Sequence, residues 1–173
     1  MDNQLLLLKI WNNIESFEKL HQLKKISQNR ELVFLCVGNS KVWYDSFGPM
    51  FGSLLQFIGL EYYVYGNIKS NVNKDNIADY VDKIKRFHIN PYIVVVDNAL
   101  SYQEEFAINI INHPIKPAFL SNDTMLVGDS AILCLTPYKD IKSSKNYFKM
   151  FKEIEKISNL IKLVFFDKIA KFT

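Results

Sequence analysis

The residues with the clearest chemical potential are two aspartates, each placed after an apolar run. Asp97 directly follows the run Tyr92 to Val96, and Asp45 lies in the loop that leaves an earlier run, Glu31 to Val37. In an open parallel sheet, the loops that leave the carboxyl ends of the strands form the ligand crevice. If the two runs are neighbouring strands, both carboxylates face one crevice. We therefore expect Asp45 and Asp97 to form the chemical site of the chain.

A close pair of carboxylates can do acid and base chemistry. Two such groups repel each other when both are charged, so one is driven towards its neutral acid while the other remains a base. The pair can therefore activate a water molecule. It could also hold a divalent metal such as nickel or zinc, but oxygen donors with few well-placed histidines would make an incomplete set of protein ligands. No other cofactor is indicated.

Each aspartate also has a structural interpretation. Asp45 could be the N-cap of the helix that follows, a role worth about 1 kcal/mol that requires no chemistry. Asp97 could be a turn residue in Asp97-Asn98-Ala99-Leu100, because Asp and Asn favour strand ends. A carboxylate directly after an apolar strand is less routine than a cap, so at Asp97 function and a turn role are about equally supported. From the residues alone both interpretations stay open.

Other motifs carry weaker signals. The segment Gly38-Asn39-Ser40-Lys41 is similar to a phosphate-binding loop, but Val42 stands where that motif requires Ser or Thr, and a second glycine is missing before the lysine. Gly128-Asp129-Ser130 lacks the second glycine of a nucleophile elbow, and no histidine is evidently paired with Ser130. We expect Asp129 to shape a turn.

The histidines offer one further candidate. His21 and His88 lie near the ends of predicted helices, where a partly exposed structural histidine is the ordinary case. His113 precedes Pro114 and could approach the crevice. It is the only histidine for which we consider a role at the site.

Length and composition narrow the class of protein. The 173 residues, 49% of them hydrophobic and 23% charged, fit one globular domain spanning residues 1–173. The net charge is +3, and Arg30 and Arg86 are the only arginines, so a nucleic-acid surface is not expected. The apolar run Leu5 to Leu8 is too short for a signal peptide or a membrane span. Cys36 and Cys134 lie inside apolar runs and predict core packing in a reducing cytoplasm.

The periodicity of apolar residues predicts an α/β fold. Strands and helices alternate, which favours a three-layer arrangement with a mainly parallel sheet flanked by helices. Expected helices cover the first residues to about Leu23, Phe47 to Leu60, Asp75 to Phe87, and a last helix capped by Ser143 or Ser144 with the face Phe148, Phe151, Ile154, Ile157 and Ile161. Expected strands are Glu31 to Val37, Glu61 to Tyr65, Tyr92 to Val96 and Ala131 to Leu135; Glu105 to Ile111 could be strand or helix.

Several segments, taken in order, resemble a known family. They are Leu35-Cys36-Val37-Gly38-Asn39, Asp45-Ser46-Phe47-Gly48-Pro49, Tyr65-Gly66-Asn67, Val94 to Ser101, and Leu126 to Ile132 after Pro114-Ile115-Lys116-Pro117. Together they resemble the YyaC-type sporulation proteins and the fold shared by spore germination protease and the hydrogenase maturation proteases, a phosphorylase/hydrolase-like fold. The resemblance covers residues from Glu31 to Leu135.

The resemblance implies a function for the two aspartates. Asp45 and Asp97 match the family's essential acidic residues, which are thought to act as an aspartic-type catalyst in germination protease and contact the nickel of the substrate in hydrogenase maturation proteases. It thus implies a sporulation-related endopeptidase that acts on a protein or peptide substrate. The neighbouring residues expected to bind that substrate are Gly38, Asn39, Ser46 and Asn98.

Two departures from the family pattern support an alternative. The glycine-rich loop of the family is replaced by Pro117-Ala118-Phe119-Leu120-Ser121, which would stiffen the place where a peptide approaches. The histidine that completes the metal site in the maturation proteases has no aligned partner. The alternative is a non-catalytic protein that binds a partner or a metal through the same crevice, with Trp43, Tyr44 and Tyr102 as candidate interface residues. The oligomeric state cannot be read from the sequence.

Overall fold

The computed structural model describes residues 14–59, 63–116, 126–142 and 146–166. Its centre is a five-stranded sheet of order β2-β1-β3-β5-β4, in which β1, β2, β3 and β5 are parallel and β4 is antiparallel to β5. The strands are β1 (Glu31–Cys36), β2 (Tyr63–Tyr65), β3 (Pro91–Ser101), β4 (Ala107–Ile111) and β5 (Ser130–Pro137).

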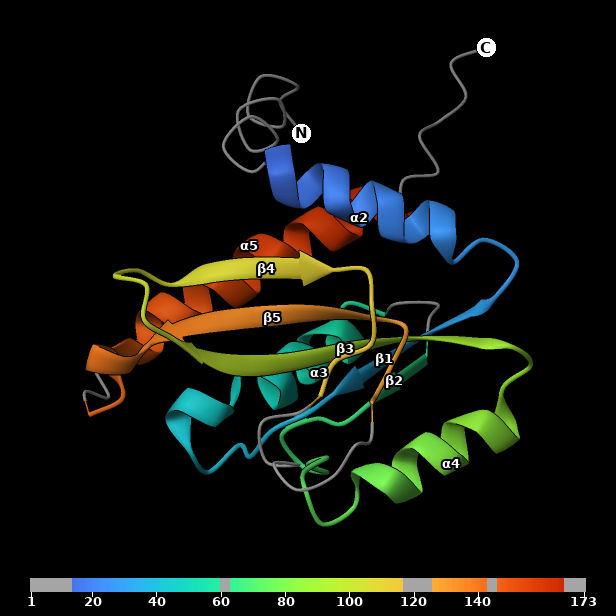
Figure 1. Cartoon of the computed structure of the whole chain (residues 1–173), viewed down its shortest axis with the longest axis horizontal. Helices are drawn as coiled ribbons and strands as arrows, with labels where there is room; N and C mark the ends of the chain where they lie inside the picture. The colour runs from blue at the N-terminus through green and yellow to red at the C-terminus, as the bar shows by residue number, and fades with distance from the viewer. Residues whose placement is uncertain (1–13, 60–62, 117–125, 143–145, 167–173) are drawn as a thin grey trace.

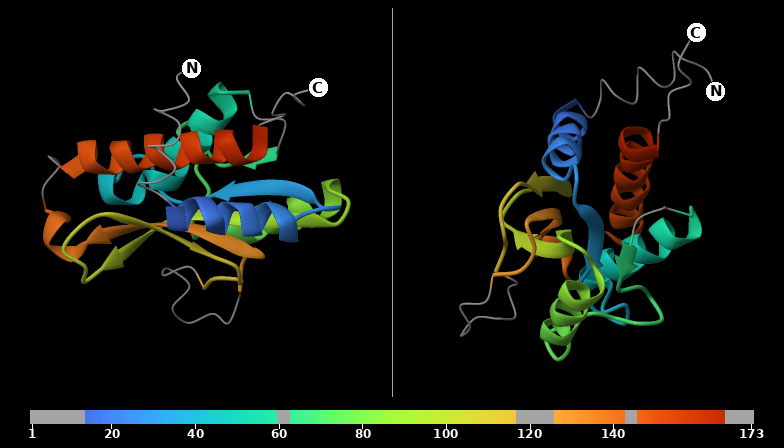
Figure 2. Two further views of the ribbon diagram at one scale, coloured as in Figure 1. Left: turned by 90° about the horizontal axis from the view of Figure 1, so that it is seen from above. Right: turned by 90° about the vertical axis from the view of Figure 1, so that its right-hand side faces the viewer.

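Helices cover both faces of this sheet. Figure 1 shows α3 and α5 behind the sheet and α4 on the near side below it, and the right-hand view of Figure 2 places α5 and α4 on opposite sides. The helices are α2 (Ile14–Ile26), α3 (Phe47–Phe57), α4 (Ile77–Phe87) and α5 (Tyr147–Phe166), with short 3-10 turns η1 (Trp43–Asp45) and η2 (Tyr138–Asp140). The predicted three-layer α/β fold with a mainly parallel sheet is confirmed.

Two apolar cores explain why the central strands have almost continuous hydrophobic sequences. On one face, alternate strand residues such as Phe34 and Val94 pack under α2, α3 and α5. On the other face, the intervening residues such as Leu35 and Val95 pack under α4. A strand covered on both faces needs apolar side chains at every position. Both cysteines are buried and unpaired, as predicted from their positions in these strands.

The strand that carries Asp97 differs from its prediction. We expected it to end at Val96, but β3 continues to Ser101 and pairs with β5 along its whole second half, from Asp97 opposite Leu133 to Ser101 opposite Pro137. The polar residues Asp97 and Asn98 suggested a turn; pairing with β5 outweighs that local preference. The ambiguous segment Glu105 to Ile111 contains a strand, β4, rather than a helix.

The predicted face of the last helix is partly wrong. Phe148 and Phe151 are 77% and 48% exposed, whereas Ile154, Ile157 and Ile161 are buried together with Met150. Steps of three residues drift by about 60° each around a helix, so the phenylalanines lie beside the buried stripe rather than on it. The predicted caps Ser143 and Ser144 lie outside the described residues, as does the loop from Pro117 to Ser121. No helix of the described ranges is long and apolar enough to cross a membrane.

Candidate functional site

The loop that carries Asp45 leaves β1 through a tight turn at Gly38. The Val37 N–H donates to the Val96 carbonyl at 2.7 Å, and the Gly38 N–H donates to the Val72 carbonyl at 2.7 Å. Gly38 has φ +139°, and a Cβ there would lie 2.1 Å from the Asp45 carbonyl oxygen. Only glycine fits such a position. The turn therefore holds the backbone of Asp45 against the end of β1.

The Asp45 side chain does not cap a helix. Its Oδ2 accepts the Asn39 N–H at 3.0 Å, and its own carbonyl accepts the same N–H at 2.9 Å. Ser46 is the N-cap residue of α3 and makes no side-chain cap bond, because its Oγ donates to the Trp43 carbonyl at 2.7 Å. The carboxylate of Asp45 is therefore left with one hydrogen bond from its own loop and is only partly buried.

A second glycine brings this loop against β3. A Cβ at Gly48, in the first turn of α3, would lie 2.0 Å from the Val37 carbonyl oxygen and 2.7 Å from that of Val96. The start of α3 thus touches the backbone of β3 at Val96 and the residue that follows β1, Val37. Asp45 precedes this contact by three residues, and Asp97 follows Val96 in β3. This close approach brings the two aspartates near each other where the β1–β3 pairing ends.

Asp97 lies inside a strand with its side chain almost fully buried. Side chains alternate along a strand, and because Val96 packs under α3 and α5, Asp97 points to the face that α4 covers. The residue is 6% exposed, and its Oδ1 accepts the Asn98 N–H at 2.7 Å. The interpretation of Asp97 as a turn residue is therefore wrong.

The two carboxyl groups differ in their tendency to ionise. Burial raises the pKa of Asp97 to about 8, although the hydrogen bond from Asn98 lowers it, and the nearby negative charge of Asp45 raises it further. Burial also raises the pKa of Asp45, against the lowering effect of the Asn39 N–H. The raised pKa of Asp97 favours its neutral, proton-donating form. Asp45, which is more exposed and accepts an N–H, is the better base.

The pair does not by itself make a metal centre. Two carboxylates supply too few ligands for a closed site of nickel or zinc. Over the described ranges, no group of three or more histidine, cysteine, aspartate or glutamate side chains lies close enough together to hold a metal ion. The residues present therefore fit acid and base chemistry better than a resident metal.

The other predicted site residues fall into two groups. Asn39 and Asn98 adjoin the pair directly, because their N–H groups bind the two carboxylates. Gly38 and Ser46 are buried and position the loop and α3. Among these four residues, therefore, only the two asparagines contact the carboxyl groups themselves.

The remaining motif residues have structural partners away from the pair. Asp129, in the bend before β5, forms an ion pair with Arg30 at 3.1 Å and accepts the Ile93 N–H at 2.8 Å, so it ties that bend to β3. The Ser130 hydroxyl is fully buried and bonds to the Tyr92 hydroxyl. His113 is exposed, with Nδ1 2.9 Å from the Pro114 carbonyl oxygen.

His88 is buried rather than partly exposed, which corrects its prediction. Its Nδ1 lies 2.7 Å from Glu31 Oε2 and its Nε2 2.8 Å from the Tyr65 hydroxyl. These contacts join the C-terminal end of α4 to β1 and β2. Residues so far apart in sequence give no local signal of this network, and sequence reasoning missed it.

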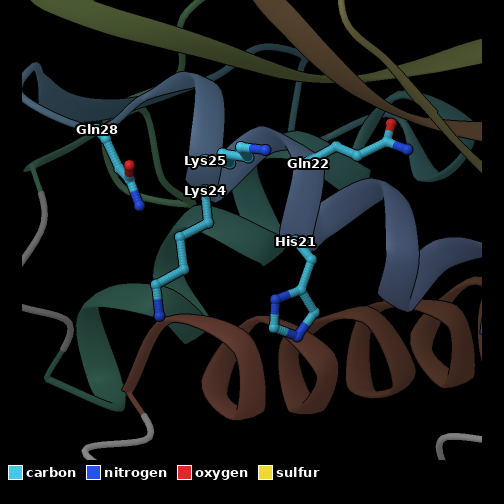
Figure 3. Close-up of a pocket in the computed structure, with 5 residues that line it drawn as sticks. All are labelled: His21, Gln22, Lys24, Lys25 and Gln28. Atoms are coloured by element: carbon cyan, nitrogen blue, oxygen red, sulfur yellow. The ribbon is translucent and has the colours of Figure 1, made fainter.

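A shallow depression lies elsewhere on the molecule. It has a volume of about 490 Å³ and is lined by α2 residues and the turn after that helix: His21, Gln22, Lys24, Lys25 and Gln28. Figure 3 shows His21 and Lys24 directed towards α5, where the Lys24 amine donates to the Val164 carbonyl at 2.6 Å. Its wall is basic and lacks a carboxylate, so it is not part of the aspartate site.

Comparison with known proteins defines first the fold and then the family. The structure superposes on a [NiFe] hydrogenase maturation protease, HycI from Thermococcus kodakarensis KOD1, with a TM-score of 0.51 and 18% identity over 81% of this chain and 98% of that one. The chain has the hydrogenase maturation protease fold. Residues 9–165 match a family model described as "Protein of unknown function (DUF1256)", and the chain belongs to that family.

A relative supports this assignment at the level of sequence. The chain is 31% identical over 103 residues to the "Uncharacterized protein YyaC" of Bacillus subtilis (strain 168), a match that covers 58% of this chain and 50% of that protein. The match thus spans about half the length of that relative. The resemblance to the YyaC-type proteins inferred from the motifs is confirmed.

Proposed function

We propose that this protein is an aspartic-type peptidase in which Asp45 and Asp97 hydrolyse a peptide bond of a protein substrate. The observation that carries the proposal is the almost fully buried Asp97 carboxyl, whose pKa is raised by burial and by the nearby charge of the partly exposed Asp45. An acid and a base held in different environments at one site are what water-mediated hydrolysis requires. The hydrogenase maturation protease fold supports the choice of reaction, although fold alone does not define function.

The two carboxyl groups have distinct roles in this reaction. The Asp45 carboxylate takes a proton from a water molecule, whose oxygen attacks the carbonyl carbon of the scissile bond. The Asp97 carboxyl donates its proton to the carbonyl oxygen. When the tetrahedral intermediate collapses, the proton held by Asp45 passes to the leaving nitrogen, the C–N bond breaks, and the hydroxyl proton returns to Asp97. No other reactant is needed, and the site ends in its starting state.

The substrate class follows from the resemblance to sporulation proteins. We propose a protein made during sporulation or a related developmental step, cleaved in the cytoplasm. Two free, buried cysteines are consistent with a reducing compartment. Incubation of the purified protein with extracts of the organism that encodes it, including sporulating cells, followed by mass spectrometry of new N-termini, would identify the substrate.

Substitution of the acid tests the mechanism. Asp97→Asn keeps the size of the side chain and an acceptor for the Asn98 N–H, but removes the proton donor, so cleavage should fall by two orders of magnitude or more. Asp82→Asn, on the exposed face of α4, is the matched control and should cleave normally. Cleavage should persist in a metal chelator and decline above pH 8 as Asp97 ionises. Unaltered cleavage by Asp97→Asn would contradict the assignment.

One observation favours a second candidate function, binding of a protein partner without catalysis. Tyr102 is 92% exposed and stacks on Tyr138 with ring centroids 5.1 Å apart, just beyond the end of β3. Exposed aromatic residues are frequent interface anchors. Trp43 is a weaker candidate, because its Nε1 is already bound to the Ile141 carbonyl at 2.9 Å. An extract in which no new N-terminus forms would favour this function.

A further inference from the structure

The backbone of β3 has a fixed alternation in the direction of its polar groups. The Val96 carbonyl faces β1, because it accepts the Val37 N–H, and the Ile93 carbonyl faces β5, because it accepts the Asp129 N–H. Alternate residues of a strand direct their N–H and C=O groups to opposite sides. The backbone groups of Asn98 and Leu100 therefore face the side on which β1 lies.

Among the residues that the structure describes, that side of β3 has no strand partner beyond Val96. The last pair of the β1–β3 ladder is Cys36 with Val96; the chain then leaves the ladder at Gly38, and its 3-10 turn η1 returns to contact β3 without forming a strand. In Figure 1, β3 and β5 run on past the point at which β1 ends. The β5 side of the same stretch is paired as far as Ser101. Residues 98–101 thus form a sheet edge although β3 lies at the centre of the sheet.

Several polar groups of this edge have no hydrogen-bond partner among the described residues. The Asn98 N–H bends to the Asp97 carboxyl. In the part of the chain that the structure describes, the Asn98 carbonyl and the Leu100 N–H and carbonyl have no hydrogen-bond partner on the β1 side. Leu100 is 39% exposed, and Asn98 is partly exposed. Unpaired groups of a strand edge are a template for another extended chain.

The edge begins at the catalytic pair proposed above. Asp97 immediately precedes Asn98, and Asp45 lies in the loop that leaves β1, the strand that would otherwise have covered this edge. A segment paired with residues 98–101 would have its own peptide bonds beside both carboxyl groups. A hydrolase that acts on a peptide bond needs this arrangement, because the bond must be held in a defined position next to the acid and the base.

We propose that the substrate binds as an extended segment that adds a strand to β3 along residues 98–101, in the place that β1 vacates. This inference takes its occupant, a protein substrate, from the proposed function. Hydrogen bonds between the backbones of the substrate and β3 would set the position of the scissile bond. Preference for particular substrate side chains would depend on the residues around this edge.

Selection of peptides separates binding from cleavage. Random linear peptides displayed on phage are selected on Asp97→Asn, which cannot cleave them, and the enriched peptides are synthesised. Leu100→Pro removes the N–H that faces the open edge without removing a bond to β5, and should weaken binding roughly tenfold. Leu100→Ala keeps the N–H and should bind more tightly than Leu100→Pro. Circular dichroism and thermal unfolding check that the proline variant is folded.

Methylation of the peptide backbone provides a test that does not depend on a protein variant. An added strand uses every second N–H, so N-methylation at alternate positions should abolish binding while methylation at the intervening positions leaves it largely intact. Amide exchange of Leu100, measured by NMR, should slow when the peptide binds. The inference would be overturned if the selection enriched no peptide. It would also be overturned if the loss of binding on N-methylation did not alternate from one peptide position to the next.

The two proposals fail differently. The selected peptides could bind with this pattern while the native protein cleaves neither these peptides nor any protein in the extract. In that case the proposed hydrolysis is wrong, but the edge still binds an extended chain. If proteins are cleaved and Leu100→Pro cleaves them with unchanged KM, the hydrolysis stands and the edge is not the binding site.

Discussion

Asp97 combines two properties that conflict in a folded protein. It is an almost fully buried carboxyl group in the interior of a strand, and in the proposed reaction it must exchange a proton. Burial without a cation partner favours the neutral form, which is the form that can donate. Because ionisation at this position is costly, Asp97 makes stability depend on pH.

The stability of the protein should therefore fall as the pH rises from about 4 to about 8. Over this range Asp97 is ionised in the unfolded chain. In the native protein the pKa of Asp97 is about 8, so the residue keeps its proton. The free energy of unfolding should decrease by about 1.4 kcal/mol per pH unit through this group. Urea unfolding at several pH values measures the slope. Asp97→Asn should remove this contribution, and Asp82→Asn should retain it; equal slopes in all three proteins would contradict the burial of Asp97.

The sequence predicted the location of the site but not the chemical roles of its two aspartates. Asp45 and Asp97 are candidates because each comes after an apolar run, and the structure places Asp45 in the chain that leaves β1 and Asp97 directly after the last β3 residue that pairs with β1. The roles of acid and base could not be assigned, because they depend on burial. Asn39 and Asn98 contact the carboxyl groups through backbone N–H groups. Such contacts depend on the conformation of the backbone and not on the type of residue, so the sequence does not reveal them.

The approach of α3 to the sheet is the element-scale feature on which the site depends. Gly48 lets the helix touch two strand ends, and Gly52 lets it approach the Gly66 carbonyl, which would lie 2.1 Å from a Cβ at position 52. These glycines occur in a helix, where they reduce intrinsic helix stability. In the folded protein, however, they allow α3 to pack closely against the neighbouring backbone.

Gly48→Ala should accordingly destabilise the protein strongly. The new Cβ would lie 2.0 Å from a backbone oxygen that cannot move without shifting β1, so we expect a loss of about 3 kcal/mol or more. Gly59→Ala is the control: a Cβ there meets nothing within 4 Å, and only its φ of +69° costs about 1 kcal/mol. Denaturant unfolding compares the two. A smaller loss at Gly48 than at Gly59 would contradict the close contact between α3 and the strand ends.

The spacing of apolar residues predicted which helices and strands exist better than it predicted the residues at which they begin and end. Strands β1 and β3 were recognised because both of their faces are buried. The continuation of β3 through Asn98 and Leu100 was missed, because it depends on pairing with β5, which lies more than thirty residues away in sequence. Phe148 and Phe151 were misplaced because apolar character alone does not distinguish a buried stripe from exposed residues beside it.

The order of the strands should determine how stability is distributed over the whole molecule. β1 and β3 lie at the centre, with neighbours on both sides and apolar cores on both faces, whereas β4 and the short β2 form the outer edges. Native-state hydrogen exchange should therefore be slowest for amides of β1 and the first half of β3. Leu100 should exchange much faster than Val94 in the same strand. Comparable protection of these two amides would contradict the open edge.

The strand order also has a consequence for the way the chain folds during synthesis. β1, β2 and β3, with α3 and α4 between them, form a complete parallel unit by residue 101, before β4 and β5 are made. Asp45 and Asp97 both belong to this unit, so the aspartates can meet while the ribosome is still translating. The β5 side of β3 stays uncovered until residue 137 has emerged. Newly made chains are thus most prone to wrong strand pairing in that interval, which is when a chaperone would be of most use.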